Sequence, residues 1–220
     1  MPAGMSVEFH ETLPAGLAAQ VAVLEQQAWP GSSPGHDPAL DPLAVLLLDG
    51  QGRVAASLAL LYKTVGLADG RTYRAAGLSA VVTRPDVRGR GYGARLVAAA
   101  RAALAADPAV DLVLFSCDRE LVPFYEAAGF EVLPGTVLVG GTPADPLATD
   151  APGMDKTVLG TFFENPGPAE THGHAETHGT AETHGHAETH GHAEGRADRV
   201  RAAFTGIRVP LHPGTLDRLW

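Results

Sequence analysis

The stretch LSAVVTRPDVRGRGYGARL, residues 78–96, decides the fold. It opens with an apolar run through Thr83 that is typical of a β-strand and then passes through a loop of glycine and arginine at 84–93. An alanine-rich segment follows and ends near Ala106 at an Asp-Pro pair, which predicts a helix over that segment. The order of strand, loop and helix places the loop at the positive end of a helix dipole.

The composition of this loop predicts an anion site. Gly89, Gly91 and Gly93 let the backbone approach a ligand closely, and the first turn of the helix presents N–H groups that have no partner within the helix. Arg88 and Arg90 add guanidinium groups that can each bind two phosphate oxygens. A pyrophosphate is the ligand that uses all of these features.

Two common phosphate motifs fit the loop poorly. A P-loop needs a lysine at the start of the helix, and the loop contains none. The spacing of Gly89, Gly91 and Ala94 formally matches the dinucleotide fingerprint. That fingerprint should follow its strand at once and open a βαβ unit, whereas here residues 84–87 intervene and an antiparallel meander precedes.

The rest of the first 163 residues reads as alternating strands and helices. Helices are predicted at 14–28 and 119–128, and strands at 43–48, 54–62, 71–76, 77–83, 110–116, 130–133 and 136–140. The last two strands are expected to pair with each other, and Gly-containing turns at 49–52 and 69–70 predict the antiparallel meander. We therefore expect one α/β (α+β) domain over residues 1–163.

The character of the chain changes after this domain. Residues 169–192 are four copies of a six-residue unit, AETHGH or AETHGT, and hold seven of the ten histidines. Strict repetition with few apolar groups predicts a disordered insert over 164–198. Alternating apolar residues at Ile207, Val209 and Leu211 then suggest that 199–220 returns to the domain.

The histidine repeat allows two interpretations. Imidazoles in a flexible chain can gather around a divalent metal such as Zn, Ni or Cu, weakly and without fixed geometry. A low-complexity expansion without function is the alternative. No metal site is expected in the domain, because His10, His36 and His212 stand alone.

The overall composition excludes several classes of protein. The formal charge of −9 argues against nucleic acid or an anionic membrane as the main partner. Neither a secretory signal nor a membrane-spanning apolar run is recognisable. Cys117 is the single cysteine, which excludes an intrachain disulfide and suits a reducing cytoplasm, so we expect a cytoplasmic protein.

The motif R-x-x-G-x-[GA], formed by Arg88, Gly91 and Gly93 after an apolar strand, resembles the acetyl-CoA-binding motif of the GCN5-related N-acetyltransferase (GNAT) superfamily. The order of elements up to about residue 163 is similar as well, and VPFYEAAGF at 122–130 resembles the characteristic helix-to-strand segment of the family. The resemblance implies a GNAT fold: a central, mixed, mostly antiparallel twisted sheet flanked by helices.

The resemblance also implies a site and a reaction. Acetyl-CoA would be bound by the strand and the loop through Val81, Val82, Thr83, Arg88, Gly89, Arg90, Gly91, Tyr92 and Gly93. Tyr125 would act as the general acid that protonates the departing thiolate, and a backbone N–H near Val81 would bind the carbonyl oxygen. A covalent route through Cys117 has no local base to support it, so direct transfer is favoured.

The acceptor is expected to be a primary amine of a small molecule. The domain layout is similar to that of the aminoglycoside 2′-N-acetyltransferases. The first fifty residues contain acidic residues but no lysine or arginine, and the resulting negative charge suits a cationic sugar. The substrate-binding candidates are Asp37, Ser79, Ser116 and the terminal Trp220. Ser79 stands where those enzymes carry a glutamate implicated as base, which leaves the base open. A homodimer is compatible with the resemblance, and the alternative function is a catalytically idle GNAT scaffold whose histidine tract binds metal.

Overall fold

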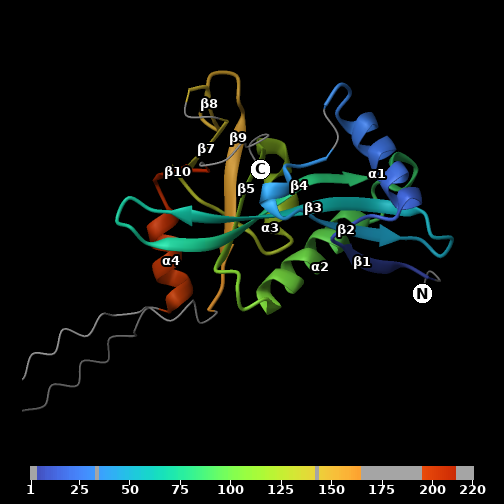
Figure 1. Cartoon of the computed structure of the whole chain (residues 1–220), viewed down its shortest axis with the longest axis horizontal. Helices are drawn as coiled ribbons and strands as arrows, with labels where there is room; N and C mark the ends of the chain where they lie inside the picture. Colours follow the sequence, from blue (N-terminus) through green and yellow to red (C-terminus); the bar gives the residue numbers. More distant parts are fainter. Residues whose placement is uncertain (1–3, 33–34, 142–143, 165–194, 212–220) are drawn as a thin grey trace, which may run out of the picture.

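The computed structural model describes residues 4–32, 35–141, 144–164 and 195–211 (Figure 1). The α-helices of this part are α1 (Ala15–Ala28), α2 (Tyr92–Ala106), α3 (Val122–Glu126) and α4 (Arg196–Phe204), and its 3-10 turns are η1 (Pro38–Leu40), η2 (Pro85–Val87) and η3 (Arg119–Leu121). Its strands are β1 (Ser6–His10), β2 (Leu43–Leu48), β3 (Val54–Gly66), β4 (Thr72–Thr83), β5 (Leu112–Asp118), β6 (Glu131–Val132), β7 (Val137–Gly141), β8 (Pro146–Ala148), β9 (Lys156–Phe162) and β10 (Arg208–Pro210).

The central sheet has the order β1-β2-β3-β4-β5-β9-β6. Its neighbouring strands are antiparallel except β4 and β5, which are parallel. Helices α1 and α2 lie on opposite sides of this sheet (Figure 1). Leu24 of α1 clusters with Leu46 and Val82 on one face, whereas α2 buries Leu96 and Val97 completely in the main core. The expected fold class, a mixed and mostly antiparallel sheet flanked by helices, is confirmed.

The predicted division between 71–76 and 77–83 is wrong. These residues form the single strand β4, and Gly77 pairs with Leu61 of β3 inside the continuous ladder. A glycine weakens the interior of a strand, but here the ladder with β3 continues through the residues on both sides of Gly77. The helix over 119–128 is also shorter than predicted, because η3 precedes α3.

The predicted pairing of 130–133 with 136–140 is wrong as well. Strand β9, which no local pattern had indicated, pairs with β5 from Phe162 to Lys156 and takes β6 as its other neighbour. Strand β7 instead joins β8 and β10 in a second, three-stranded sheet. A strand that returns from far along the chain therefore replaces the local hairpin.

The C-terminal described residues pack on the domain. Strand β10 runs parallel to β7, and Val209 and Leu211 are fully buried, in agreement with the alternating pattern of the sequence. Phe204 of α4 stacks edge-on against Tyr73 at 5.3 Å between ring centroids. Helix α4 begins at Arg196, inside the last residues of the range expected for the insert. The histidine repeat lies outside the described residues.

A buried carboxylate connects α4 to the central sheet. Asp111 accepts a hydrogen bond from the backbone N–H of Arg74 at 2.8 Å and one from the guanidinium of Arg196 at 2.6 Å. Because Asp111 is only 4% exposed, both bonds are shielded from water and contribute more than surface ion pairs do.

Within the described ranges, no helix is both long and apolar enough to cross a membrane.

Candidate active site

Strands β4 and β5 separate in the middle of the central sheet. They pair only through Ala75 with Leu112 and Ala76 with Val113. Beyond these pairs, β4 continues to Thr83 against β3, while β5 continues against β9. The last part of β4 therefore has a ladder partner on one side only, and its other edge can form β-type hydrogen bonds with an extended amide chain.

A bulge distorts β4 beside this gap. Ser57 of β3 pairs with Val82 and Ala59 pairs with Ser79, so Ala80 and Val81 together oppose a single residue of β3. Ala80 has a φ of 51°, in the left-handed region that non-glycine residues seldom adopt. Such strain is often found at functional sites, where a bulge turns backbone groups out of the ladder.

The glycine loop leads from this strand into α2. Gly89 and Gly91 have φ values of 75° and 76°, and a Cβ added at either would meet no atom within 4 Å. Gly91 is the N-cap of α2 and supplies no side chain to cap the first turn. The loop therefore presents open backbone N–H groups and the positive helix end to the same space, which suits an anion.

Gly93 serves a different purpose from the two open glycines. A Cβ at this position would lie 2.9 Å from Thr83 Oγ1 and 3.5 Å from the ring of Phe124. The absence of a side chain lets the first turn of α2 pack closely on the end of β4 and on α3. This glycine sets the distance between the loop and the gap.

The arginines of the loop differ in their attachments. Arg84 pairs with Asp86 at 2.7 Å, and Arg95 donates to the backbone oxygen of Met5 at 3.2 Å. Arg88 donates through Nε to Thr83 O at 3.1 Å, which fixes its direction and leaves its terminal nitrogens for an anion. Arg90 is exposed at the tip of the loop. Arg88 and Arg90 are thus the arginines placed to reach a ligand there.

Tyr125 lies on α3, on the side of the sheet that α2 covers. It is 5% exposed, and its ring lies edge-on against Phe115 at 4.8 Å and Phe124 at 4.9 Å between centroids. Burial, and then the nearby Cys117 and Asp118, raise the pKa of its hydroxyl above the ordinary value for tyrosine. Tyr125 therefore keeps its proton at neutral pH.

Cys117 follows Phe115 on the same face of β5. It is 5% exposed, and burial, followed by the charge of Asp118, raises the pKa of its thiol to about 11. A thiol with that pKa is almost entirely protonated at neutral pH, so it is a poor nucleophile. Cys117 packs in the core beside Tyr125.

The substrate-binding residues predicted from the sequence do not gather into one cluster. Ser79 on β4 is opposite Ala59, and the alternation along β5 puts Ser116 on that same face of the sheet. Asp37 accepts a hydrogen bond from the N–H of Ala39 at 2.9 Å and caps η1. Burial lowers the pKa of Lys63, and the charge of Asp37 partly opposes this lowering. Trp220 lies outside the described residues.

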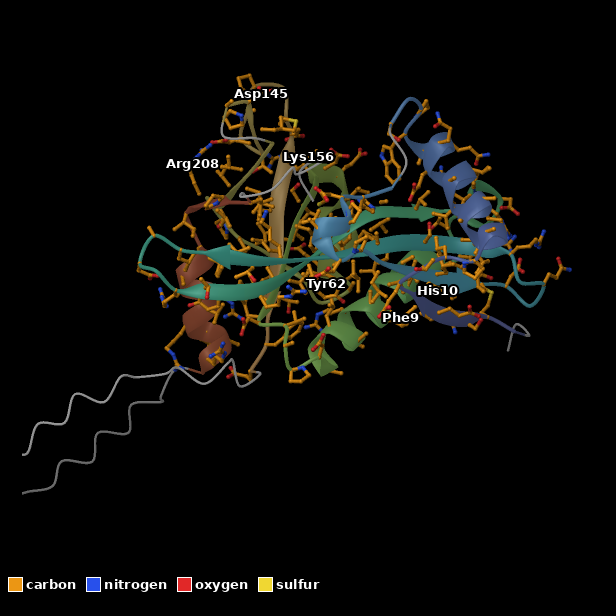
Figure 2. The ribbon with its side chains drawn as sticks, in the orientation of Figure 1. Phe9, His10, Tyr62, Asp145, Lys156 and Arg208 are labelled. Atoms are coloured by element: carbon orange, nitrogen blue, oxygen red, sulfur yellow. The ribbon has the colours of Figure 1, made fainter. Side chains whose placement is uncertain are left out.

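Sequence reasoning missed a cavity of about 530 Å³ between α1 and the β2–β3 part of the sheet. Its walls are mainly apolar and come from residues 10–13, 18–25, 35–46 and 57–59. Its polar residues include Glu25, Ser57 and His10, the last residue of β1, which is labelled in Figure 2. No local signal could have indicated it, because the lining comes from four separate segments.

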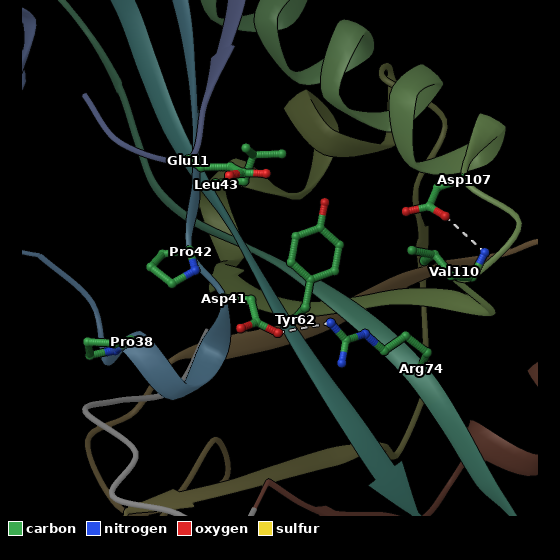
Figure 3. Close-up of a pocket in the computed structure, with 10 residues that line it drawn as sticks. Glu11, Pro38, Asp41, Pro42, Leu43, Tyr62, Arg74, Asp107 and Val110 are labelled. Carbon is green, nitrogen blue, oxygen red and sulfur yellow. Dashed lines mark hydrogen bonds and ion pairs between the residues drawn. The ribbon is translucent and has the colours of Figure 1, made fainter. Parts of the chain in front are cut away.

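A second cavity, of about 630 Å³, opens beside Tyr62 and Arg74 (Figure 3). Three of its charged groups have partners within the chain: Arg74 pairs with Asp41 at 3.1 Å, and Asp107 accepts a hydrogen bond from the N–H of Ala109 at 2.9 Å. The guanidinium of Arg74 also lies 5.5 Å from the centroid of the Tyr62 ring. These contacts explain Arg74 and Asp107 as structural groups, so they give no indication of a ligand in this cavity.

Comparison with known proteins agrees with this geometry. The sequence model of one family, described as an acetyltransferase (GNAT) domain, matches residues 11–133. No curated protein sequence matches significantly.

Among the described residues, no group of three or more His, Cys, Asp or Glu side chains could hold a metal ion.

Several solved structures share the fold. The GNAT family N-acetyltransferase YhbS from Escherichia coli, in complex with CoA, is similar over 98% of this chain and 96% of its own, with 16% identity and a TM-score of 0.54. Escherichia coli ElaA covers 71% of this chain and 98% of its own, with 15% identity and a TM-score of 0.50. Arabidopsis thaliana NAA60, in complex with a bisubstrate analogue, covers 73% and 100%, with 8% identity and a TM-score of 0.50.

Proposed function

Because the chain belongs to the acetyltransferase (GNAT) domain family, we propose that it moves the acetyl group of acetyl-CoA to a primary amine of a small molecule by direct attack. The observation that carries the proposal is the gap between β4 and β5, which opens beside a loop of unobstructed glycines at a helix N-terminus. An extended amide chain that ends in a pyrophosphate has the shape to lie in the gap and the charge to bind at the glycine loop.

We assign the binding of acetyl-CoA to the backbone of β4 and to the loop. The free edge of β4 at Val81, Val82 and Thr83 would pair with the amides of the pantetheine arm. The N–H groups of the loop, together with Arg88 and Arg90, would bind the pyrophosphate. When bound, acetyl-CoA supplies an acetyl group already activated as a thioester.

Tyr125 is proposed to protonate the departing sulfur. An ordinary phenol and an ordinary thiol differ by less than about 2 pKa units. Burial raises the pKa of Tyr125, but it also raises that of Cys117, a thiol in the same surroundings. A thiolate leaving beside Tyr125 would be destabilised in the same way, so the two groups stay close enough for proton transfer.

Cys117 takes no part in this proposal. Its buried, protonated thiol supports direct attack by the amine rather than an acetyl-cysteine intermediate. Because Ser79 cannot serve as a base, the group that deprotonates the amine must lie elsewhere. The resemblance alone would narrow the acceptor to an aminoglycoside, but the mainly apolar lining of the cavity between α1 and the sheet favours an amine with fewer charges.

The experiment is a thiol-release screen of the full chain with acetyl-CoA and a panel of small primary amines. We expect release of CoA together with an acetylated amine identified by mass spectrometry. The variant Cys117→Ala is the control, and it should keep the activity. Absence of acetyl-CoA binding by calorimetry would reject the proposal and favour the idle-scaffold alternative.

A further inference from the structure

The cavity between α1 and the sheet lies next to the distorted part of β4. Its floor includes Ser57 and Ala59, whose partners in the β3–β4 ladder are Val82 and Ser79. The bulge at Ala80 lies between those partners on the neighbouring strand. The cavity therefore adjoins, on the face opposite α2, the part of β4 to which we assign the binding of acetyl-CoA.

Glu25 is the carboxylate most enclosed by this cavity. It projects from α1 and is partly buried, and burial raises the pKa of its carboxyl above the ordinary value. Glu11, the other acid in the lining, is exposed. Of the two imidazoles in the lining, His10 pairs with Glu8 at 3.1 Å, and His36 also has a partner within the chain.

Ser57 provides a second, independent indication of a ligand. It is 2% exposed and lines the cavity, and its Oγ has no hydrogen-bond partner among the described residues. A buried hydroxyl without a partner is unfavourable, and native proteins keep few of them without a functional reason. A polar group of a bound molecule would satisfy it after a small shift of the wall.

We propose that this cavity binds the acceptor, that the acceptor is a primary monoamine with a compact apolar body, and that Glu25 is the general base. This inference rests on the proposed function. The carboxylate of Glu25 pairs with the ammonium of the amine and takes one of its protons. Ser57 lies in the floor, where its hydroxyl can bond to the amine nitrogen.

The atoms of the reaction balance with these groups. The neutral nitrogen forms a bond to the acetyl carbon, the bond from that carbon to sulfur breaks, and the sulfur takes the proton of Tyr125. The surplus proton of the new amide returns to the Tyr125 oxygen. Glu25 then releases its proton to solvent, so one proton leaves for each ammonium that is acetylated.

The lining selects against polycations. Residues such as Val21, Leu46 and Ala59 give the cavity apolar walls, and only one of its carboxylates is partly buried. A sugar with several ammonium groups would have to bury charges without partners, which is strongly unfavourable. A single ammonium on an apolar body satisfies both the carboxylate and the walls.

The test is calorimetric binding to the full chain in the presence of CoA, which reports on the cavity without turnover. The probes are 2-phenylethylamine, its neutral analogue 2-phenylethanol and the polycation kanamycin. We expect the amine to bind about tenfold or more tightly than the alcohol, as for one charge-assisted hydrogen bond. Glu25→Gln should lose that preference, whereas Glu120→Gln, at an exposed position on η3 outside the cavity, should keep it.

Turnover adds a second readout. With acetyl-CoA, Glu25→Gln should lower kcat/KM by about 100-fold at neutral pH and recover as the pH rises and the free amine becomes abundant. The other titratable groups in the lining are Glu11, His10 and His36, so Glu11→Gln and His10→Gln show how much of the pH profile comes from groups other than Glu25. Equal binding of amine and alcohol, or of Glu25→Gln and wild type, would overturn the inference. A wild type that binds the amine but acetylates nothing refutes the proposed function instead.

Discussion

The two faces of the central sheet differ in how their candidate sites are built. On the face covered by α2, the loop at 84–93 and the segment at 122–130 supply the glycines, arginines and tyrosine as two short stretches of sequence. On the face covered by α1, the cavity is assembled from four segments that are distant in sequence. On one face of the sheet, the candidate site comes from short contiguous segments. On the other face, the fold brings together residues that are distant in sequence.

We expect this difference to separate the residues that bind the acetyl donor and carry out the transfer from the residues that select the acceptor. A contiguous motif can be recognised in sequence because the backbone geometry it needs depends on its own residues. Scattered lining residues can change one at a time without disturbing that geometry. Variants on the α2 face should therefore affect the donor and the chemical step, and those on the α1 face should affect the acceptor.

The largest effect is expected from Tyr125→Phe. Removing the hydroxyl takes away the proposed acid but keeps the ring contacts with Phe115 and Phe124, so turnover should fall by about 100-fold or more. The Kd for acetyl-CoA should change little. In wild type, the high pKa of Tyr125 predicts that turnover stays constant on the alkaline side past the ordinary titration range of tyrosine. Equal turnover of variant and wild type would remove Tyr125 from the mechanism.

Arg88→Ala should affect binding of the donor rather than chemistry. Loss of one charge-assisted contact to a phosphate predicts about tenfold weaker acetyl-CoA binding with little change in kcat. Arg95→Ala is the matched control, because Arg95 is nearby on α2 but donates to the backbone of Met5. Calorimetry with acetyl-CoA distinguishes the two, and a similar loss in both variants would mean that the effect is general electrostatics.

Much of the α2 face could be predicted from the sequence, and the remainder shows where local patterns fail. The bounds of α2 and β2 follow from alanine content and apolar runs. Strand β9 could not be found, because its place between β5 and β6 depends on long-range pairing. The bulge at Ala80 and the direction of Arg88 also depend on neighbouring strands and loops. Glu25 gave no signal, since a single glutamate on a surface helix is common.

Two glycines allow a smaller and sharper test. Gly91 has a φ of 76°, so Gly91→Ala should destabilise the fold by about 1 kcal/mol through backbone strain and weaken acetyl-CoA binding. Gly16 lies in α1 with open space around it and no positive φ, so Gly16→Ala should be neutral or slightly stabilising. Thermal denaturation and calorimetry report both. A stable Gly91→Ala with full affinity would contradict the proposed loop.

The smallest effect concerns stability at Glu25. Its folded pKa is raised, so the folded state holds more protons than the unfolded state, and stability is lost as the pH rises from 4.5 through the folded pKa. Glu25→Gln removes this cost and should have a slightly higher Tm than wild type at neutral pH. The difference should vanish below pH 4.5. A lower Tm at neutral pH would indicate that the carboxylate supports the fold.

The side chain of Glu164 connects the end of the β9 region to the start of α4. Its carboxylate accepts hydrogen bonds from the N–H groups of Arg196 at 2.9 Å and Ala197 at 3.1 Å. Residues 164 and 196 are therefore clasped together whatever the length of chain between them, and each doubling of that length adds only about 0.6 kcal/mol of closure entropy. A hexapeptide array between these residues can therefore gain or lose copies at a small cost in stability, because the contacts of Glu164 hold the two flanking segments together.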